Sequence, residues 1–154
     1  MDRAGLEDRL AATLPGLRPG TRLIISAPNG GYVQVAVEGD GVDAEVASND
    51  AVGDDLLADA AVADLARRGW EPPGAHCVNH HRALVGVPSA ADVRALARDL
   101  ADALVHGFGA APETLVHRAW REPQRPGLFR RGGDPGEDPL PLPSLGLPAE
   151  TLEG

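Results

Sequence analysis

A short histidine and cysteine cluster has the clearest capacity for chemistry in this sequence. It consists of His76, Cys77, His80 and His81. Thiolate and imidazole groups are the ligands that zinc prefers. Along an extended strand, however, His76 and His80 point to one face and Cys77 and His81 to the other. A helical turn would bring Cys77 and His81 together, but the preceding prolines and glycine disfavour a helix. We therefore expect neither a metal site nor a bound cofactor here.

Thiol chemistry is the second possibility for this region. Cys77 is the only cysteine, so an intrachain disulfide is excluded. It could in principle pair with His117 as a nucleophile with a base. No local motif presents the thiol on a sharp strand-to-helix turn, and a bystander thiol is the better interpretation. We expect no catalysis; the alternative is an uncharacterised metal- or thiol-dependent enzyme that uses the His76, Cys77, His80 and His81 region.

The charge distribution and the glycines exclude further classes of function. Neither a GxGxxG nor a GxxxxGK[ST] pattern is present, which removes the common dinucleotide and phosphate loops. The net charge is −9, and the stretch from Glu38 to Asp64 holds nine carboxylates and no arginine. Such a stretch repels phosphate backbones, so no nucleic acid is expected as a partner. It indicates a solvated acidic face, with steering of a basic partner as the alternative.

Composition also indicates the source and the compartment. All fourteen basic residues are arginine, and alanine, glycine, proline and valine are abundant, which is typical of a bacterial genome with high GC content. Residues 1–10 lack the apolar core of a signal peptide. The longest uncharged stretch, Leu23 to Val37, is too short and too polar to span a bilayer. We expect a cytoplasmic protein with no membrane contact.

The strongest structural pattern lies between Thr21 and Ser48, where apolar residues recur at every second position. This period predicts three strands, at 21–27, 32–37 and 42–48. A turn at Gly39-Asp40 pairs Val37 with Val42. For the first hairpin, a three-residue loop at 29–31 pairs Ile25 with Val35 and so places the apolar side chains on one face.

Helical patterns flank these strands. Apolar side chains at helical spacing predict helices at 5–14, 57–68 and 89–107, the last opened by a capping arrangement of Ser89 and Asp92. A fourth strand is expected at 78–85, and 112–120 forms a short element of uncertain type. The order predicts an α+β fold: a helix, a three-stranded antiparallel meander, a helix, a strand and a long helix.

The composition changes after Arg121. The last 33 residues contain seven prolines and six glycines, and they show almost no periodicity. We therefore expect a single α+β domain over residues 1–121 and a Pro/Gly-rich disordered tail over 122–154. Within the tail, Pro139 to Pro143 alternates proline with leucine and could serve as a docking peptide, with a plain solvated tail as the alternative.

Several phrases in this order resemble the TY-Chap family, the peptide-binding chaperone domains related to type III secretion chaperones and to YbjN. They span about residues 5–121. The matching phrases are Leu23-Ile24-Ile25-Ser26-Ala27, Gly31-Tyr32-Val33-Gln34, Ala44-Glu45-Val46-Ala47-Ser48-Asn49, Gly69-Trp70-Glu71-Pro72-Pro73, Asn79-His80-His81-Arg82-Ala83-Leu84, Ala90-Ala91-Asp92-Val93 and Leu115-Val116-His117-Arg118-Ala119-Trp120. The run His81-Arg82-Ala83 departs from the Arg-Glu-Leu more typical of the family.

The resemblance implies a non-catalytic, chaperone-like domain that binds a segment of a polypeptide client and forms a possible homodimer. An open sheet can add an extended peptide at its edge or hold one across a face. Our candidates for a peptide-binding face are Ile24, Tyr32 and Gln34, which share the side of the meander opposite the apolar residues. The alternative is that a second layer of helix covers this side.

Overall fold

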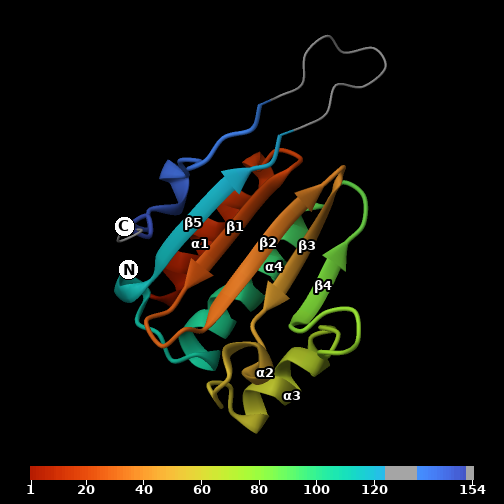
Figure 1. Cartoon of the computed structure of the whole chain (residues 1–154), viewed down its shortest axis with the longest axis vertical. Coiled ribbons are helices and arrows are strands. Elements are labelled where there is room, and N and C mark those ends of the chain that lie inside the picture. Colours follow the sequence, from red (N-terminus) through yellow and green to blue (C-terminus); the bar gives the residue numbers. More distant parts are fainter. Residues whose placement is uncertain (124–134, 152–154) are drawn as a thin grey trace.

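A five-stranded antiparallel sheet with helices on one face forms the body of the protein. The computed structural model describes residues 1–123 and 135–151. The sheet has the strand order β4-β3-β2-β1-β5. In Figure 1, α1 and α4 lie behind the sheet, and in the described part of the chain no helix covers its front. The elements are α1 (Arg3–Thr13), β1 (Thr21–Ser26), β2 (Tyr32–Glu38), β3 (Gly41–Val46), α2 (Asn49–Val52), α3 (Asp59–Arg67), β4 (His80–Leu84), α4 (Ala90–Asp102) with a π turn over Ala103–Gly107, and β5 (Val116–Arg121). The α+β fold expected from the sequence is confirmed.

The hydrophobic core lies between the sheet and the two helices behind it. Alternate residues of β1 and β2 are buried, and α1 and α4 supply leucines at helical spacing that meet them. The side chains below 2% exposure include Leu6, Leu10, Leu23, Ile25, Val33, Val35, Leu100, Leu104 and Leu115. Burial of such side chains is the main favourable contribution to folding. It also fixes which face of each strand is left for other contacts.

The two hairpins of the meander test the predicted pairing. The second is confirmed, since Val37 pairs with Val42 across the β2–β3 turn. The first is wrong by two residues, because Ile25 pairs with Val33 and not with Val35. The loop has three residues as expected, but it closes one residue earlier, at 28–30, where the Ala27 amide donates to the Gly31 carbonyl at 2.8 Å. A shift of two residues leaves every side chain on its expected face.

The element of uncertain type at 112–120 is a strand. β5 pairs antiparallel with β1, from Thr21 opposite Arg121 to Ser26 opposite Val116. β1 is thereby an inner strand of the sheet. The expected capping arrangement at the start of α4 is present: the Ser89 hydroxyl accepts from the Asp92 amide at 3.1 Å, and the Asp92 carboxylate accepts from the Ser89 amide.

The structure differs from the expected disordered tail over residues 135–151. Leu145 is fully buried and Leu147 is 7% exposed, and both belong to the same hydrophobic cluster as the helices and the sheet. A short 3-10 turn, η4 (Pro143–Leu145), packs against α1. Proline and glycine content predicted disorder because it ignores these few leucines, whose partners on α1 are more than a hundred residues away in sequence. Residues 124–134 and 152–154 of the tail lie outside the described residues.

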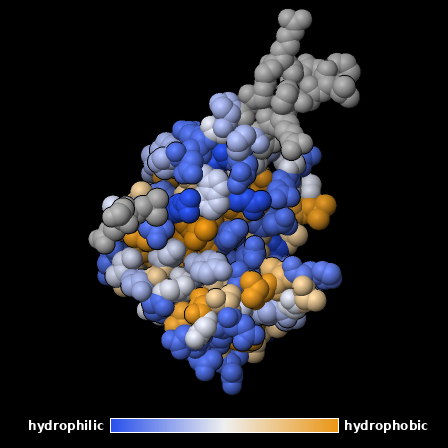
Figure 2. All heavy atoms as spheres, viewed as in Figure 1, coloured by the Kyte–Doolittle hydropathy of each residue, from blue (hydrophilic) through white to orange (hydrophobic). Residues whose placement is uncertain are grey.

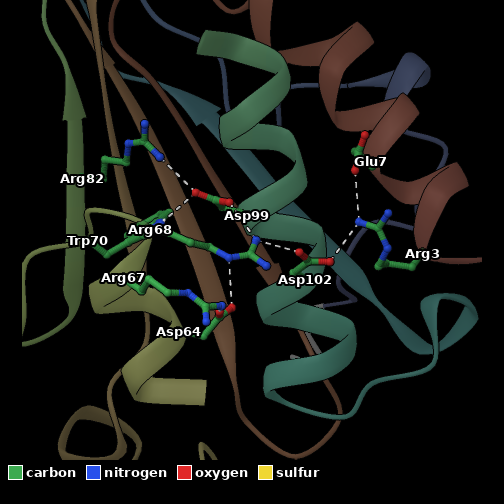
Figure 3. A network of polar contacts seen from close by, with 9 residues as sticks. All are labelled: Arg3, Glu7, Asp64, Arg67, Arg68, Trp70, Arg82, Asp99 and Asp102. Atoms are coloured by element: carbon green, nitrogen blue, oxygen red, sulfur yellow. Dashed lines mark hydrogen bonds and ion pairs between the residues drawn. The ribbon is translucent and has the colours of Figure 1, made fainter. Parts of the chain in front are cut away.

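A network of ion pairs joins the helices to Arg82 in the middle of β4 (Figure 3). Asp99 of α4, 5% exposed, accepts hydrogen bonds from Arg68 at 2.9 Å, Arg82 at 3.0 Å and the Trp70 indole at 3.1 Å. Asp102, one turn on, accepts from Arg68 at 2.7 Å and from Arg3 of α1 at 2.9 Å. A buried carboxylate needs such partners to stay charged. The network therefore holds α1, α3 and α4 in register with the sheet.

Candidate functional site

The histidine and cysteine cluster does not converge. β4 begins only at His80, so His76 and Cys77 lie in the preceding loop. His80 is buried opposite Val46 on the core side, while His81 lies opposite Glu45 on the helix-free side. Within residues 1–123 and 135–151, no three histidine, cysteine or acidic side chains are arranged to hold a metal ion.

The thiol is also poorly placed for catalysis. The Cys77 sulfur donates a hydrogen bond to Glu45 Oε1 at 3.3 Å. Burial raises the pKa of the Cys77 thiol, and the neighbouring Glu45 carboxylate raises it further. The thiolate is the nucleophilic form, so both effects keep this sulfur in its unreactive state. His117 is the base that the sequence offered. It lies on β5, the last strand in the sheet order, whereas the loop of Cys77 precedes β4 at the other end of that order.

The helix-free side of the sheet, which we call the open face, carries rows of side chains that cross all five strands. Successive residues of a strand point to opposite faces of the sheet. Residues that lie directly opposite one another on neighbouring strands therefore share a face and form a continuous row. The first row is Arg118, Ile24, Gln34, Glu45 and His81, and the second is Trp120, Arg22, Ala36, Asp43 and Ala83. Figure 2 shows this side as a mainly polar surface with separate apolar patches.

The three candidate residues from the sequence lie on the open face. Ile24 and Gln34 are direct cross-strand partners, and Tyr32, two residues before Gln34 on β2, lies opposite Ser26. All three side chains are half-buried. Tyr32 packs in part against the hydrophobic core cluster. The geometry thus leaves Ile24 and Gln34 adjacent at the middle of the first row.

Tyr32 has an additional structural contact. Its hydroxyl accepts a hydrogen bond from Asn79 Nδ2 at 3.1 Å, and the same nitrogen donates to Glu45 Oε1 at 3.1 Å. Asn79 is 3% exposed, and its side-chain oxygen accepts from the Ser48 amide at 3.1 Å. These bonds fasten the loop before β4 to the end of β3. The hydroxyl of Tyr32 therefore already has a hydrogen-bond partner within the protein.

β5 adds two residues to the open face that the sequence reasoning missed. The Arg118 guanidinium lies over the Trp120 ring, 4.7 Å from its centroid. The Trp120 indole donates to Glu122 Oε1 at 2.9 Å. The sequence signal for them is the alternation of Val116, Arg118 and Trp120 with residues that the structure buries, in a segment whose type the sequence leaves uncertain.

Charge divides the open face into two halves. The half formed by β5 and β1 carries Arg118 and Arg22, whereas the β3 part carries Asp43 and Glu45. Arg22 lies 3.4 Å from Glu38 and 3.7 Å from Glu122, both exposed carboxylates. Exposed pairs of this kind contribute little to stability, about 0 to 1 kcal/mol. The arginine can therefore exchange partners at small cost.

A hollow of about 660 Å³ lies on the other side of the molecule, between α3 and the end of α4. Its walls are rich in alanine, and the ion pairs of Arg68 with Asp99 and Asp102 form part of its lining. These charged groups already satisfy one another. The hollow therefore follows from the small side chains of the packed helices, and we assign no ligand to it.

The comparisons agree with the fold. Residues 4–121 match the model of the TY-Chap3 family, described as the T3SS (YopN, CesT) and YbjN peptide-binding chaperone 3. No curated protein and no solved structure gives a match. Within the described residues, no helix is long and apolar enough to cross a membrane. Since the match covers more than half of the chain, this protein belongs to the TY-Chap3 family of peptide-binding chaperone domains.

Proposed function

We propose that this protein is a non-catalytic chaperone-like module that holds an extended segment of another polypeptide across the open face of its sheet. The single observation that carries the proposal is the one-sided covering of the sheet: α1 and α4 pack on one face, and the other presents side chains in two rows. Membership of a peptide-binding chaperone family supports a polypeptide client.

The centre of the open face offers complementary contacts to an extended chain. Ile24 supplies a half-exposed apolar surface, and the adjacent Gln34 amide can both donate to and accept from a peptide backbone. Beside them, Trp120 supplies an aromatic surface of the kind that dominates binding energy at interfaces. Tyr32 contributes its ring, because its hydroxyl is bonded to Asn79.

The charges of the open face favour one orientation of the bound segment. A client that carries acidic residues at one end and basic residues at the other would match Arg22 and Arg118 on one half and Asp43 and Glu45 on the other. Such complementarity contributes more to specificity and association rate than to affinity. The open face thus favours a client of mixed charge.

Catalysis by the thiol region is the weaker interpretation. The raised pKa of Cys77 and the opposite orientations of His80 and His81 both oppose a nucleophile or metal mechanism. We infer that the chain acts by binding alone, in the bacterial cytoplasm.

Weak homodimer formation belongs to the same proposal. Among the described residues, the outer edge of β4 makes backbone bonds only at His81, to Glu71, at 2.8 and 3.0 Å. Just beyond the strand, Val85 is 95% exposed and Val87 is 82% exposed. An edge with exposed valines is suited to pairing with a second copy.

A random library of displayed 12-residue peptides tests the function even though the client is not identified. Selected peptides are measured by fluorescence anisotropy against the wild-type chain and two variants. Ile24→Thr keeps a β-branched residue and reduces the apolar contact, and we expect weaker binding by about tenfold. Arg98→Ala, on the exposed side of α4, is the control and should bind normally. A library that yields no binder, or binders insensitive to Ile24→Thr, would reject the proposal.

A further inference from the structure

The described part of the tail adds to the outer edge of β5 through its backbone. Arg121 and Glu137 exchange two backbone hydrogen bonds, at 2.7 and 3.0 Å, and the Leu140 amide donates to the Ala119 carbonyl at 2.8 Å. Further on, the His117 amide donates to the Pro148 carbonyl at 3.0 Å, and the Glu150 amide donates to the His117 carbonyl at 2.8 Å.

These bonds use the outward-facing groups of three alternate residues of β5. Strand addition at a sheet edge is the way in which many domains capture extended peptides. The family match ends at Arg121, so the edge belongs to the family domain and the segment that covers it does not. The tail therefore occupies this edge as an intramolecular peptide.

A small set of leucines holds the tail in place. Leu145 is fully buried and Leu147 is 7% exposed, and both join the cluster that contains Leu6 and Leu10 of α1. Leu140 and Leu142 are partly buried against the same cluster. The Ser144 and Thr13 hydroxyls lie 3.0 Å apart. Most of the intervening residues are exposed, so the contact depends on leucine positions and backbone bonds.

An open hollow borders the contact between the tail and β5. A hollow of about 880 Å³ lies between them, lined by His117, Arg118 and Ala119 on one side and by tail residues on the other. A hollow of this size falls in the range of ligand pockets. The segment therefore places its leucines in the hydrophobic cluster while its backbone runs beside an open groove, as a bound peptide does.

We propose that the groove between β5 and α1 is a second peptide-binding site, and that residues 137–150 occupy it as an exchangeable intramolecular ligand. The site takes an extended segment of another polypeptide that carries leucine at every second or third position with prolines between, as in the tail itself. This site borders the open face at Arg118 but uses the edge of β5 and the leucine contacts with α1, and it goes beyond the function proposed above.

The covalent link makes the tail a competitor. A tethered ligand acts at an effective concentration in the millimolar range, so a free segment of equal intrinsic affinity binds only weakly while the tail is attached. Cutting the link removes that advantage. A client that matches the leucine pattern better than the tail can displace it from the intact chain.

The test uses the full chain with a specific protease site placed within residues 124–134. After cleavage, a fluorescent synthetic peptide of residues 135–151 is added and its anisotropy is measured. We expect saturable binding to the cut chain, at least about tenfold tighter than to the uncut chain. A peptide that keeps only the leucines and prolines of residues 139–148 should also bind, and its scrambled form should not.

Two peptide variants locate the contact. A Leu145→Ala peptide should bind at least about 30-fold more weakly, since truncation of a buried leucine is costly. A Thr151→Ala peptide changes an exposed residue and should bind like the parent. Ile24→Thr in the protein should leave tail-peptide binding unchanged, so failure at this groove is distinguishable from failure at the open face.

Three results would overturn the proposal. A cut chain that keeps its circular dichroism yet fails to exchange the labelled peptide over days would make the contact permanent. Loss of structure on cutting would make the tail an integral part of the fold. Equal binding to cut and uncut chains would place the peptide somewhere other than the groove.

Discussion

The side chain of Asn79 donates a hydrogen bond to the hydroxyl of Tyr32 at 3.1 Å, and this bond connects the loop before β4 to the open face. It separates two roles of Tyr32, the ring as a contact surface and the hydroxyl as a support for the loop.

Substitution of Tyr32 tests both roles. Tyr32→Phe removes the acceptor and keeps the ring, while Asn79 retains its bond to Glu45. We expect a loss of about 1 kcal/mol of unfolding free energy and unchanged client affinity. Tyr32→Ala removes the ring and should weaken client binding by about 1 to 2 kcal/mol. Calorimetry and thermal denaturation measure the two effects. Unchanged affinity in a folded Tyr32→Ala protein would remove Tyr32 from the binding face.

The Asp99 network should carry a large share of the stability. Asp99→Ala leaves the Trp70 indole and the guanidinium groups of Arg68 and Arg82 without their shared acceptor. We expect a loss of about 3 kcal/mol in urea denaturation, because breaking a buried ionic contact leaves charge uncompensated. Arg67→Ala breaks an exposed pair with Asp64 and is the control, expected below about 0.5 kcal/mol. Equal effects of the two variants would show that the network adds no more than a surface pair.

Acid should destabilise the protein in part through His80. Burial lowers the pKa of His80 in the folded state, whereas the unfolded value is about 6.5. The unfolded chain then binds more protons as the pH falls. The contribution to stability is therefore complete above the unfolded pKa and is lost as the pH drops towards the folded pKa.

A comparison of variants isolates this effect. We expect His80→Gln to show a smaller loss of unfolding free energy between about pH 7.5 and pH 5.5 than the wild type. His106→Gln replaces an exposed histidine and should keep the wild-type dependence. If His80→Gln and the wild type have the same pH dependence, burial of His80 is not a source of acid sensitivity.

Self-association should depend on the edge of β4. Val85→Lys places a charge beside the strand edge and should reduce dimer formation. Val78→Lys makes the same change at a valine that is 55% exposed and lies before the strand, and it serves as the control. Light scattering over a concentration series measures both. A wild-type mass that stays at 16.0 kDa at high concentration would contradict the dimer.

Local patterns predicted the meander well because the information lies within each strand. The alternation of Val33 and Val35 fixes the buried face whichever partner is chosen. The register of the first hairpin depends on where the turn closes, and Ala27 with Gly31 extends the ladder in a way that glycine spacing did not show. The buried face of the meander was therefore predictable from the sequence, and the pairing of the first hairpin was not.

Contacts between distant segments account for the rest. β5 carries two arginines, Arg118 and Arg121, among its six residues, and only its pairing with β1 identifies it as a strand. Leu145 is buried by α1 at the other end of the sequence, so composition predicted disorder where the chain is packed. For the candidate site, the sequence placed Ile24 and Gln34 on one face, whereas Arg118 and Trp120 join that face only through the pairing of β5.

Chemical-shift mapping tests the central claim most directly. The protein is labelled with nitrogen-15 and titrated with the tightest peptide selected from the library, and the amide shifts are followed. Binding across the open face predicts changes centred on β1, β2 and β5, including Ile24, Gln34 and Trp120, with α1 and α4 largely unaffected. Changes confined to the hollow between α3 and α4, or to the helices alone, would contradict the account.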